Sequence, residues 1–221
     1  IDVSSMYPAF IVNNNIRPYH IKKEFGELFK EFYEKRLSLK PLAKRDKKIK
    51  GIVDAYKLLL NGCYGKFGSK DSWLYDPQAM LSVTIGCQLC LIMLIEDLEL
   101  NGIKIVSANT DGLLLYYPNE LTSLKEEITK KWEKITGFLL ENVLMKEIYF
   151  LSVNDYLAIT KSGDVKLKGD FLIDLEFHKN KSFRIIPIAL REYFVNNNQN
   201  IEEFIKNHNN LMDFCARANV N

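Results

Sequence analysis

Val106-Ser-Ala-Asn-Thr-Asp-Gly-Leu-Leu-Leu-Tyr-Tyr117 is a short polar segment enclosed by two apolar runs. Asn, Asp and Gly tolerate the backbone angles of a tight turn, so the pattern predicts a β-hairpin with its tip at residues 109–112. Asp111 would stand at that tip, between strands too apolar to be exposed. A lone carboxylate in such surroundings needs a metal or a cation as its partner, although an ordinary turn Asp of an antiparallel sheet gives the same pattern.

A second lone acidic residue lies at the start of the chain, in Ile1-Asp-Val-Ser-Ser-Met-Tyr-Pro8. The pattern predicts a strand over residues 2–6, followed by a short helix or loop up to residue 13. If this strand and the hairpin meet at one end of a sheet, Asp2 and Asp111 form a carboxylate pair that can hold hard divalent cations through oxygen. Such a pair can support a two-metal displacement reaction.

A predicted helical hairpin separates the two acidic stretches. Apolar residues recur at three- and four-residue steps from about residue 24 to 48, which predicts a helix with one apolar stripe. Pro41 would end or kink this helix, Gly51 would mark a second break, and another helix is expected over residues 52–64. The apolar stripe consists of Phe25, Leu28, Phe29, Phe32, Tyr33 and Leu37.

Polar side chains on this hairpin are spaced to share one face. Arg36 and Lys40 are four residues apart. Lys57, Asn61 and Tyr64 stand at i, i+4 and i+7 of the second helix. Folding the hairpin would aim its cations at one anion, such as a triphosphate, whose leaving group gains negative charge in the transition state. Cations on a helix surface also commonly serve only solvation, and this alternative stays open for Arg36 and Lys40.

Together, the three stretches resemble the palm and fingers of family B DNA polymerases over about residues 1–175. The segment Asp2-Val-Ser-Ser-Met-Tyr-Pro8 is similar to motif A of that family, Asp-x-x-Ser-Leu-Tyr-Pro. The segment Lys57-Leu-Leu-Leu-Asn-Gly-Cys-Tyr-Gly65 fits motif B, Lys-x-x-x-Asn-x-x-Tyr-Gly, at every defined position. The segment Asn109-Thr-Asp-Gly112 is similar to motif C, Asp-Thr-Asp-Ser, but Asn109 and Gly112 replace its first Asp and its Ser. Asp111 keeps the Asp that the family uses as a direct metal ligand.

The resemblance implies roles for individual residues. Asp2 and Asp111 would be catalytic and would bind two Mg²⁺ ions, or Mn²⁺ in their place, together with the Val3 carbonyl. Tyr7 would stack under the incoming sugar and clash with a 2′-hydroxyl. The other implied nucleotide-binding residues are Ser5, Met6, Arg36, Lys40, Lys57, Asn61 and Tyr64. The implied DNA-binding residues are Gly65, Thr110, Tyr156, Lys168 and Gly169. Lysine contacts to the primer-template backbone give affinity without reading sequence.

The expected fold class is α+β: a polymerase palm with an antiparallel sheet, an inserted helical hairpin as fingers and the start of a thumb. The resemblance divides the chain into palm (1–23), fingers (24–66), palm (67–183) and the start of a thumb (184–221). Sequence patterns predict further helices over 76–100, 121–136, 188–195 and 201–207, and strands over 143–150, 155–160 and 165–169. The helix over 76–100 is expected to be largely buried through Leu81, Ile85, Leu89, Ile92 and Ile95.

Composition and charge restrict the class of protein. The 221 residues are 47% hydrophobic and 12% aromatic, which indicates a globular chain. The longest apolar stretch, residues 89–95, is too short to cross a bilayer. Residues 17–70 hold 15 Lys/Arg against 6 Asp/Glu, a net of +9, whereas residues 71–160 hold 6 against 13, a net of −7. This asymmetry is typical of a polyanion partner at one face and cations at another, or simply of solvated helix faces.

Two other motifs have simpler explanations than a site. The four cysteines fit a reducing compartment, and Cys87-x-x-Cys90 has no second pair of ligands nearby, so core packing is favoured over zinc binding. The Gly-rich segment 62–69 lacks the Gly-x-x-x-x-Gly-Lys-Ser/Thr order of an NTPase phosphate loop, and the NTPase function is therefore rejected.

The sequence thus predicts a DNA-directed DNA polymerase that adds deoxynucleotides to a primer 3′-hydroxyl by a two-metal mechanism. We expect it to be one part of a longer, compact bacteriophage-type replicative enzyme. It would be monomeric and without a membrane partner, working on primer-template DNA and deoxynucleoside triphosphates in the cytoplasm. The alternatives are a non-catalytic polymerase-like module that only binds nucleic acid, motivated by Asn109, and an RNA-making palm enzyme, disfavoured by Tyr7.

Overall fold

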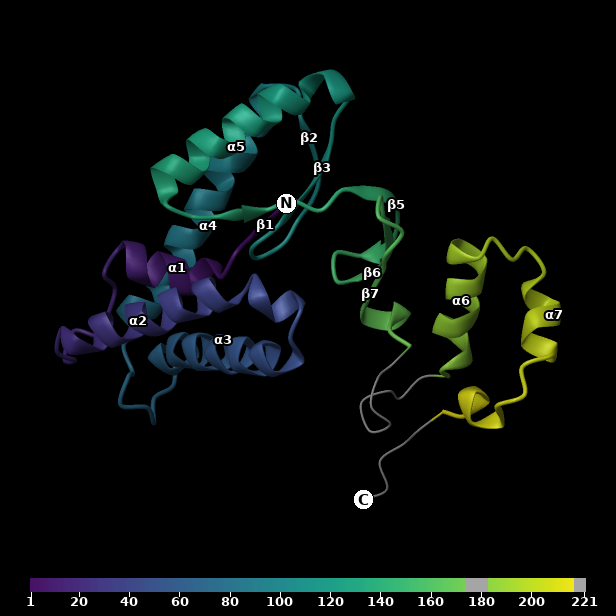
Figure 1. Ribbon diagram of the computed structural model, residues 1–221, viewed down its shortest axis with the longest axis horizontal. Coiled ribbons are helices and arrows are strands. Elements are labelled where there is room, and N and C mark those ends of the chain that lie inside the picture. Colours follow the sequence, from purple (N-terminus) through teal and green to yellow (C-terminus); the bar gives the residue numbers. More distant parts are fainter. Residues whose placement is uncertain (174–182, 217–221) are drawn as a thin grey trace. The chain divides into compact units, whose positions relative to one another are not determined.

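The protein divides into two compact units, Ile1–Asn142 and Val143–Asn221, which are described one at a time. The structure is a computed structural model and describes residues 1–173 and 183–216 (Figure 1). Helices alternate with small antiparallel sheets, which confirms the coarse α+β prediction. The boundaries of palm, fingers and thumb stay predictions, and residues 174–182 of the expected palm and 217–221 of the expected thumb lie outside the described residues.

Short strands in the first unit bring the two acidic stretches together. The predicted hairpin forms from β2 and β3, while β1 pairs antiparallel with β4 and places Asp2 opposite Glu141. Asp2 also forms an isolated antiparallel bridge with Gly112 at the hairpin tip. The hairpin is less buried than expected, because Val106 is exposed. The strands are β1 (Asp2–Val3), β2 (Lys104–Ala108), β3 (Leu113–Tyr116) and β4 (Leu140–Glu141).

Five helices surround these strands. Their common core includes Phe67, Leu94, Leu98 and Trp132, which are almost fully buried. The indole Nε1 of Trp132 donates a hydrogen bond to the Cys90 carbonyl at 2.7 Å and so ties two helices together. The helices are α1 (Met6–Asn13), α2 (Glu24–Leu39), α3 (Lys47–Phe67), α4 (Pro77–Leu100) and α5 (Thr122–Thr136), with 3₁₀ turns at Leu42–Lys44 and Asn119–Leu121.

Two predicted boundaries near the start of the chain are wrong. The first strand ends at Val3 rather than at residue 6, because Ser5 adopts a left-handed conformation (φ 55°) that turns the chain into α1. Gly51 is not a break but lies inside α3, which begins at Lys47. The Asp46 side chain caps this helix by accepting from the Lys48 amide at 2.7 Å. Relative to Ala, a Gly inside a helix costs only about 1 kcal/mol of helix stability, which a helix of this length tolerates.

The apolar stripe predicted for α2 is only partly buried. Phe29 and Tyr33 lie in the core, whereas Leu28 is half exposed. The helix ends at Leu39, so of the two outcomes expected at Pro41, an end and a kink, the structure has the end.

The predicted buried face of α4 is also wrong. Leu81, Ile85, Leu89 and Ile92 are exposed, and Ile95 is only half buried. The buried face lies on the other side of the helix, because α4 is apolar nearly all round and its periodicity does not choose a face. The residues of the buried face are Ala79, Val83, Cys87, Leu91, Leu94 and Leu98.

Helix α4 also corrects the expectation about membrane spans. In the described part of the chain it is the one helix long and apolar enough to cross a membrane, with a mean hydropathy of 1.9. A single such helix is weak evidence, since a core helix of a soluble protein passes the same test. Within its unit, α4 packs against α1, α3, α5 and β2.

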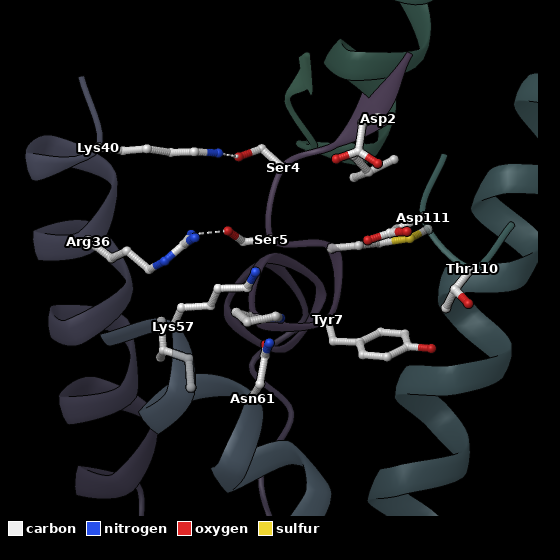
Figure 2. Close-up of a pocket in the computed structure, with 14 residues that line it drawn as sticks. Asp2, Ser4, Ser5, Tyr7, Arg36, Lys40, Lys57, Asn61, Thr110 and Asp111 are labelled. Atoms are coloured by element: carbon white, nitrogen blue, oxygen red, sulfur yellow. Dashed lines mark hydrogen bonds between the residues drawn. The ribbon is translucent and has the colours of Figure 1, made fainter. Parts of the chain in front are cut away.

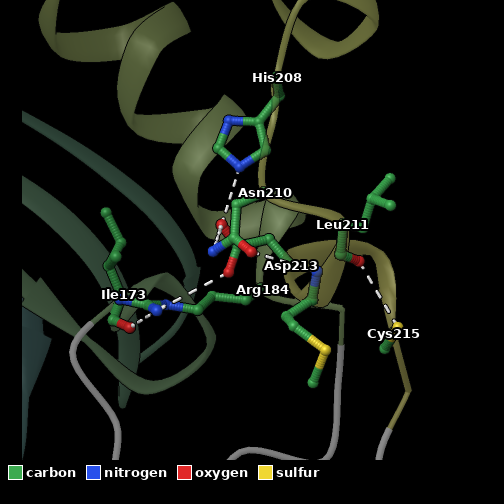
Figure 3. A network of polar contacts seen from close by, with 8 residues as sticks. Ile173, Arg184, His208, Asn210, Leu211, Asp213 and Cys215 are labelled. Atoms are coloured by element: carbon green, nitrogen blue, oxygen red, sulfur yellow. Dashed lines mark hydrogen bonds and ion pairs between the residues drawn. The ribbon is translucent and has the colours of Figure 1, made fainter.

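The second unit contains a three-stranded antiparallel sheet in the order β5–β6–β7 and two helices. The buried carboxylate of Asp213 joins the later segments: it accepts from His208 Nε2 at 2.8 Å and Asn210 Nδ2 at 3.1 Å, and pairs with Arg184 at 3.7 Å (Figure 3). The elements are β5 (Met145–Ser152), β6 (Asp155–Thr160), β7 (Val165–Lys168), α6 (Ile185–Val195) and α7 (Ile201–Lys206), with 3₁₀ turns at Gly169–Phe171 and Leu211–Phe214.

Candidate active site

A pocket of about 360 Å³ in the first unit collects most of the residues that the sequence singled out. Its walls come from β1, the first turn of α1, one face each of α2 and α3, and the tip of the β2–β3 hairpin. The predicted site residues that line it are Asp2, Val3, Ser5, Met6, Tyr7, Arg36, Lys40, Lys57, Asn61, Thr110 and Asp111. Ser4, Pro8 and Leu60 line it as well and were not predicted.

One wall of the pocket is acidic. The backbone fixes it, because the Val3 amide donates to the Asp111 carbonyl at 2.6 Å and Asp2 bridges Gly112. A Cβ at position 112 would lie 2.9 Å from Asp2 Oδ1 and 3.2 Å from the Ile1 carbonyl oxygen. Gly112 therefore leaves room for the Asp2 carboxylate that the Ser of motif C would crowd.

Asn109 shapes the turn that presents Asp111. Its side-chain oxygen accepts from the amide of Asp111 at 3.1 Å and from the amide of Gly112 at 2.6 Å. This is the local side chain-to-backbone pattern for which Asn and Asp are favoured in turns. An amide oxygen performs this structural task without a charge, so Asn109 keeps the hairpin tip formed.

The electrostatic surroundings of Asp2 favour a cation. Its carboxylate loses hydration to the pocket walls and faces the negative charges of Asp111 and Glu141, and these effects raise its pKa above 3.8. The N-terminal ammonium and Lys40 lower the pKa but do not cancel these effects. Ionisation of Asp2 in the folded protein therefore costs free energy, and a bound cation would offset that cost.

Glu141 is a site residue that the sequence reasoning missed. It stands opposite Asp2 in the β1–β4 pair and forms an ion pair with Lys40. The available signal was weak: Glu141 ends the short apolar run 138–140, as a lone acidic residue at a strand end.

The opposite wall of the pocket is basic (Figure 2). Arg36 is only 7% exposed; it donates to the Ser5 hydroxyl, and its buried Nε has no hydrogen-bond partner among the described residues. Lys40 Nζ donates to the Ser4 hydroxyl at 2.7 Å. Burial lowers the pKa of Arg36, although Glu141 partly opposes this. Arg36 is therefore not a cation that merely solvates an exposed helix surface.

The floor of the pocket is the N-terminus of α1. No side chain caps this helix, whose first turn contains Met6 and Tyr7 and follows the left-handed Ser5. Uncapped amides at a helix N-terminus, together with the helix dipole, favour an anion. Ser5, Met6 and Tyr7, which the resemblance implies bind the nucleotide, thus belong to one structural feature.

Several predicted residues lie away from the pocket lining. Tyr64 packs against Tyr7, with ring centroids 4.4 Å apart, and its hydroxyl contacts Thr84 Oγ1 at 2.8 Å. A Cβ at Gly65 would meet nothing within 4 Å, so that position is open.

The remaining predicted DNA contacts belong to the second unit. Tyr156 and Lys168 are cross-strand partners in β6 and β7, and the Lys168 ammonium lies 5.7 Å from the Tyr156 ring centroid. Gly169 follows with φ 63°, a conformation that favours glycine. Their DNA-binding role stays a prediction.

The side chains fit a metal that is shared with a substrate. In the described ranges, no group of three or more His, Cys, Asp or Glu side chains is arranged to hold a metal ion by itself. Mg²⁺ is commonly bound by one or two carboxylates plus substrate phosphates rather than by an all-protein cage. Asp2 and Asp111 beside a pocket with a basic wall match that mode of binding.

Comparisons with known proteins show what the chain as a whole is similar to. No family model matches the chain. The chain is 26% identical over 205 residues to the DNA polymerase of Thermococcus sp. (strain 9oN-7) and 29% identical over 202 residues to DNA polymerase 1 of Aeropyrum pernix, in each case across 76% of its own length. The structure of the family B DNA polymerase from Pyrobaculum calidifontis matches 93% of this chain with a TM-score of 0.60 at 17% identity.

This chain is thus similar in sequence to archaeal DNA polymerases and has the fold of a segment of a family B DNA polymerase. It spans about a quarter of the length of the curated relatives it matches. These relatives are archaeal, so they do not test the predicted bacteriophage source.

Proposed function

We propose that this chain carries the nucleotidyl-transfer site of a DNA-directed DNA polymerase. The observation that supports this most is the pocket in which Asp2 and Asp111 face Arg36, Lys40 and Lys57 across the open N-terminus of α1. The basic wall suits the polyanionic end of a ligand. The acidic wall suits divalent cations beside the atom of the ligand that is attacked.

The basic wall would hold the triphosphate of a deoxynucleotide. Arg36, with a buried Nε in need of an acceptor, and Lys57, on the facing helix, would bind its phosphate oxygens. The first-turn amides of α1 would bind the same group from below. Preorganised donors of this kind stabilise the charge that develops on a leaving pyrophosphate.

The acidic wall would hold the divalent cations. Bound there, such ions would lower the pKa of the primer hydroxyl and neutralise phosphate charge. Asp2 and Asp111 would supply oxygen ligands and Gly112 would keep the Asp2 carboxylate uncrowded. Mg²⁺ is the expected ion and Mn²⁺ its substitute.

Tyr7 would select the deoxyribose sugar. Tyr7 lines the pocket and its ring packs against the ring of Tyr64, so the ring has little freedom to move aside for a 2′-hydroxyl. This supports DNA synthesis over the RNA-making alternative. Primer-template DNA and deoxynucleoside triphosphates are the proposed partners, replication in the cytoplasm the proposed setting, and a monomer the proposed state.

The test is single-turnover primer extension by the chain in excess over primer-template, with Mg²⁺ and one deoxynucleotide. We expect Asp111→Ala to reduce incorporation at least about a hundredfold, since it removes a ligand worth several kcal/mol in the transition state. Glu120→Ala, an exposed acidic residue away from the pocket, is the matched control and should behave as the parent. If the parent incorporates the nucleotide and Asp111→Ala does so at the same rate, the proposal is refuted.

Asn109 keeps the non-catalytic alternative under consideration. Asn109→Asp retains the oxygen that accepts from the turn amides and adds one charge beside Asp111. A polymerase should therefore keep or gain activity in this variant. If neither the parent nor Asn109→Asp incorporates a nucleotide while both still bind primer-template, the chain is a binding module instead.

A further inference from the structure

Arg36 and Lys40 lie one turn apart on α2 and line the same pocket, but their hydrogen bonds differ. The buried Nε of Arg36 has no hydrogen-bond partner among the described residues, so Arg36 has a donor to offer a ligand. Lys40 Nζ already donates to the Ser4 hydroxyl at 2.7 Å and forms an ion pair with the Glu141 carboxylate. Two of the three donors of the ammonium group are therefore used within the protein.

A phosphate group could recruit Lys40 only by replacing the Glu141 carboxylate. The ammonium group would then exchange one anion for another. It would also leave the acidic wall, where its positive charge favours the ionised form of Asp2, the antiparallel partner of Glu141. Lys40 is thus better placed to stay with its protein partners than to move to a ligand.

The contacts of Lys40 join three parts of the first unit. Lys40 is the C-cap of α2, Ser4 directly follows β1, and Glu141 ends β4. Strands β1 and β4 are 2 residues long each, so their pairing contributes few hydrogen bonds. An ammonium group bound at the ends of both strands therefore helps to fix the separation of the acidic wall, which β1 carries, from the basic wall on α2.

A second contact of the same kind lies one helical turn away (Figure 2). Arg36 donates to the hydroxyl of Ser5, the neighbour of Ser4 in sequence. Adjacent side chains of a strand point to opposite faces, but the left-handed backbone of Ser5 turns the chain, and both hydroxyls reach α2. Of these two contacts, only the one made by Lys40 is reinforced by a carboxylate.

We propose that Ser4 and Glu141 are positioning residues, which hold Lys40 as a tie between α2 and the β1–β4 pair. In this arrangement, called the Lys40 tie, Lys40 sets the shape of the pocket instead of binding the triphosphate. The tie keeps the phosphate-binding wall in register with Asp2, and a displacement of reacting groups by about 1 Å can cost a hundredfold in rate. The inference rests on the proposed nucleotide pocket.

The test is the affinity of the chain for a fluorescent deoxynucleoside triphosphate, measured in EDTA so that a changed affinity for metal ions does not enter. By charge alone, Glu141→Ala should strengthen the binding of an anion. The Lys40 tie predicts the opposite: Glu141→Ala and Lys40→Met should each weaken binding about threefold to fivefold, the range of a partly exposed ion pair. The double variant should bind no more weakly than either single variant, because all three remove the same contact.

Conservative and control variants separate the tie from a general structural effect. Lys40→Arg can form the same two contacts and should recover most of the affinity that Lys40→Met loses. Glu31→Ala is the matched control, since it breaks an exposed ion pair with Lys35 that lies within α2 and joins no other element. Its affinity for the nucleotide should equal that of the parent.

Hydrogen exchange without any ligand measures the tie itself. Exchange should rise across residues 36–46 in Glu141→Ala but not in Glu31→Ala, because only the former frees the end of α2 from the strands. Unchanged exchange in Glu141→Ala would overturn the inference, and so would nucleotide binding as tight as in the parent or tighter. A parent that binds no nucleotide would refute the proposed pocket, whereas the exchange measurement would still decide whether the tie exists.

Discussion

At the residue scale, the raised pKa of Asp2 links the proposed metal site to stability. A carboxyl whose pKa is higher in the folded than in the unfolded chain is protonated more readily when folded. The free energy of unfolding therefore falls as the pH rises from below 3.8 through the folded pKa, and stays reduced above it. At neutral pH the metal-free site is destabilised by its own charges, Asp2, Asp111 and Glu141.

Asp2→Asn removes this charge, and we expect two measurable results. Without metal, the variant should be slightly more stable than the parent near neutral pH, by under about 1 kcal/mol, because solvent still reaches the partly covered side chain and screens its charge. This advantage should vanish in acid, where the parent carboxyl is protonated. Added Mg²⁺ or Mn²⁺ should raise the melting temperature of the parent but not of the variant, because only the parent binds it. A parent that is more stable than the variant in metal-free neutral buffer would contradict the electrostatic reading of the site.

The sequence identified most of these residues because their chemistry is local. Asp2 and Asp111 stand out as lone acids among apolar neighbours, and Lys57 and Asn61 as polar residues on one helix face. What it could not give was the effect of pairing between distant segments. Glu141 enters the site only through strand register with Asp2, and Gly112 is explained only by the closeness of the Asp2 carboxylate.

At the scale of elements, α4 shows that the periodicity of apolar residues can fail to predict which face of a helix is buried. The helix begins at Pro77, one residue after the predicted start, and ends at Leu100, as predicted; Asp76 is its N-cap and accepts from the Ala79 amide at 2.9 Å. A helix cap depends on residues that are close in sequence, so it can be predicted from the sequence. The buried face is decided by what packs against the helix, and a helix that is apolar on both sides gives no preference.

Two leucines of α4 test this assignment of faces. Leu94 is fully buried and Leu89 is 60% exposed, although they are five residues apart in the same helix. Leu94→Ala should lower the free energy of unfolding by about 2–5 kcal/mol, because it leaves a cavity in the core. Leu89→Ala should change it by less than about 1 kcal/mol. Urea denaturation of both variants measures the difference, and the reverse ranking would restore the face that the sequence predicted.

At the scale of the whole molecule, the pocket belongs to one unit, and the buried polar network of Asp213 that stabilises the other unit lies outside it. All the residues that line the pocket belong to the first unit, whereas the buried Asp213 carboxylate organises the second. Effects of mutations that share no partners usually add rather than couple. A defect confined to the second unit should therefore leave the binding of a nucleotide in the pocket unchanged.

Asp213→Ala is the substitution that tests this separation. It removes the acceptor of His208 and Asn210 and the partner of Arg184 in a buried position, which typically costs about 2–4 kcal/mol. Glu202→Ala, which loses only an exposed pair with Lys206, should cost no more than about 0.5 kcal/mol and serves as its control. Hydrogen exchange should rise across residues 185–214 in Asp213→Ala alone, while the affinity for a fluorescent deoxynucleoside triphosphate with Mg²⁺ stays at the parent value. Loss of nucleotide affinity in step with the loss of protection would mean that the second unit shapes the pocket, and that the site cannot be understood from the first unit by itself.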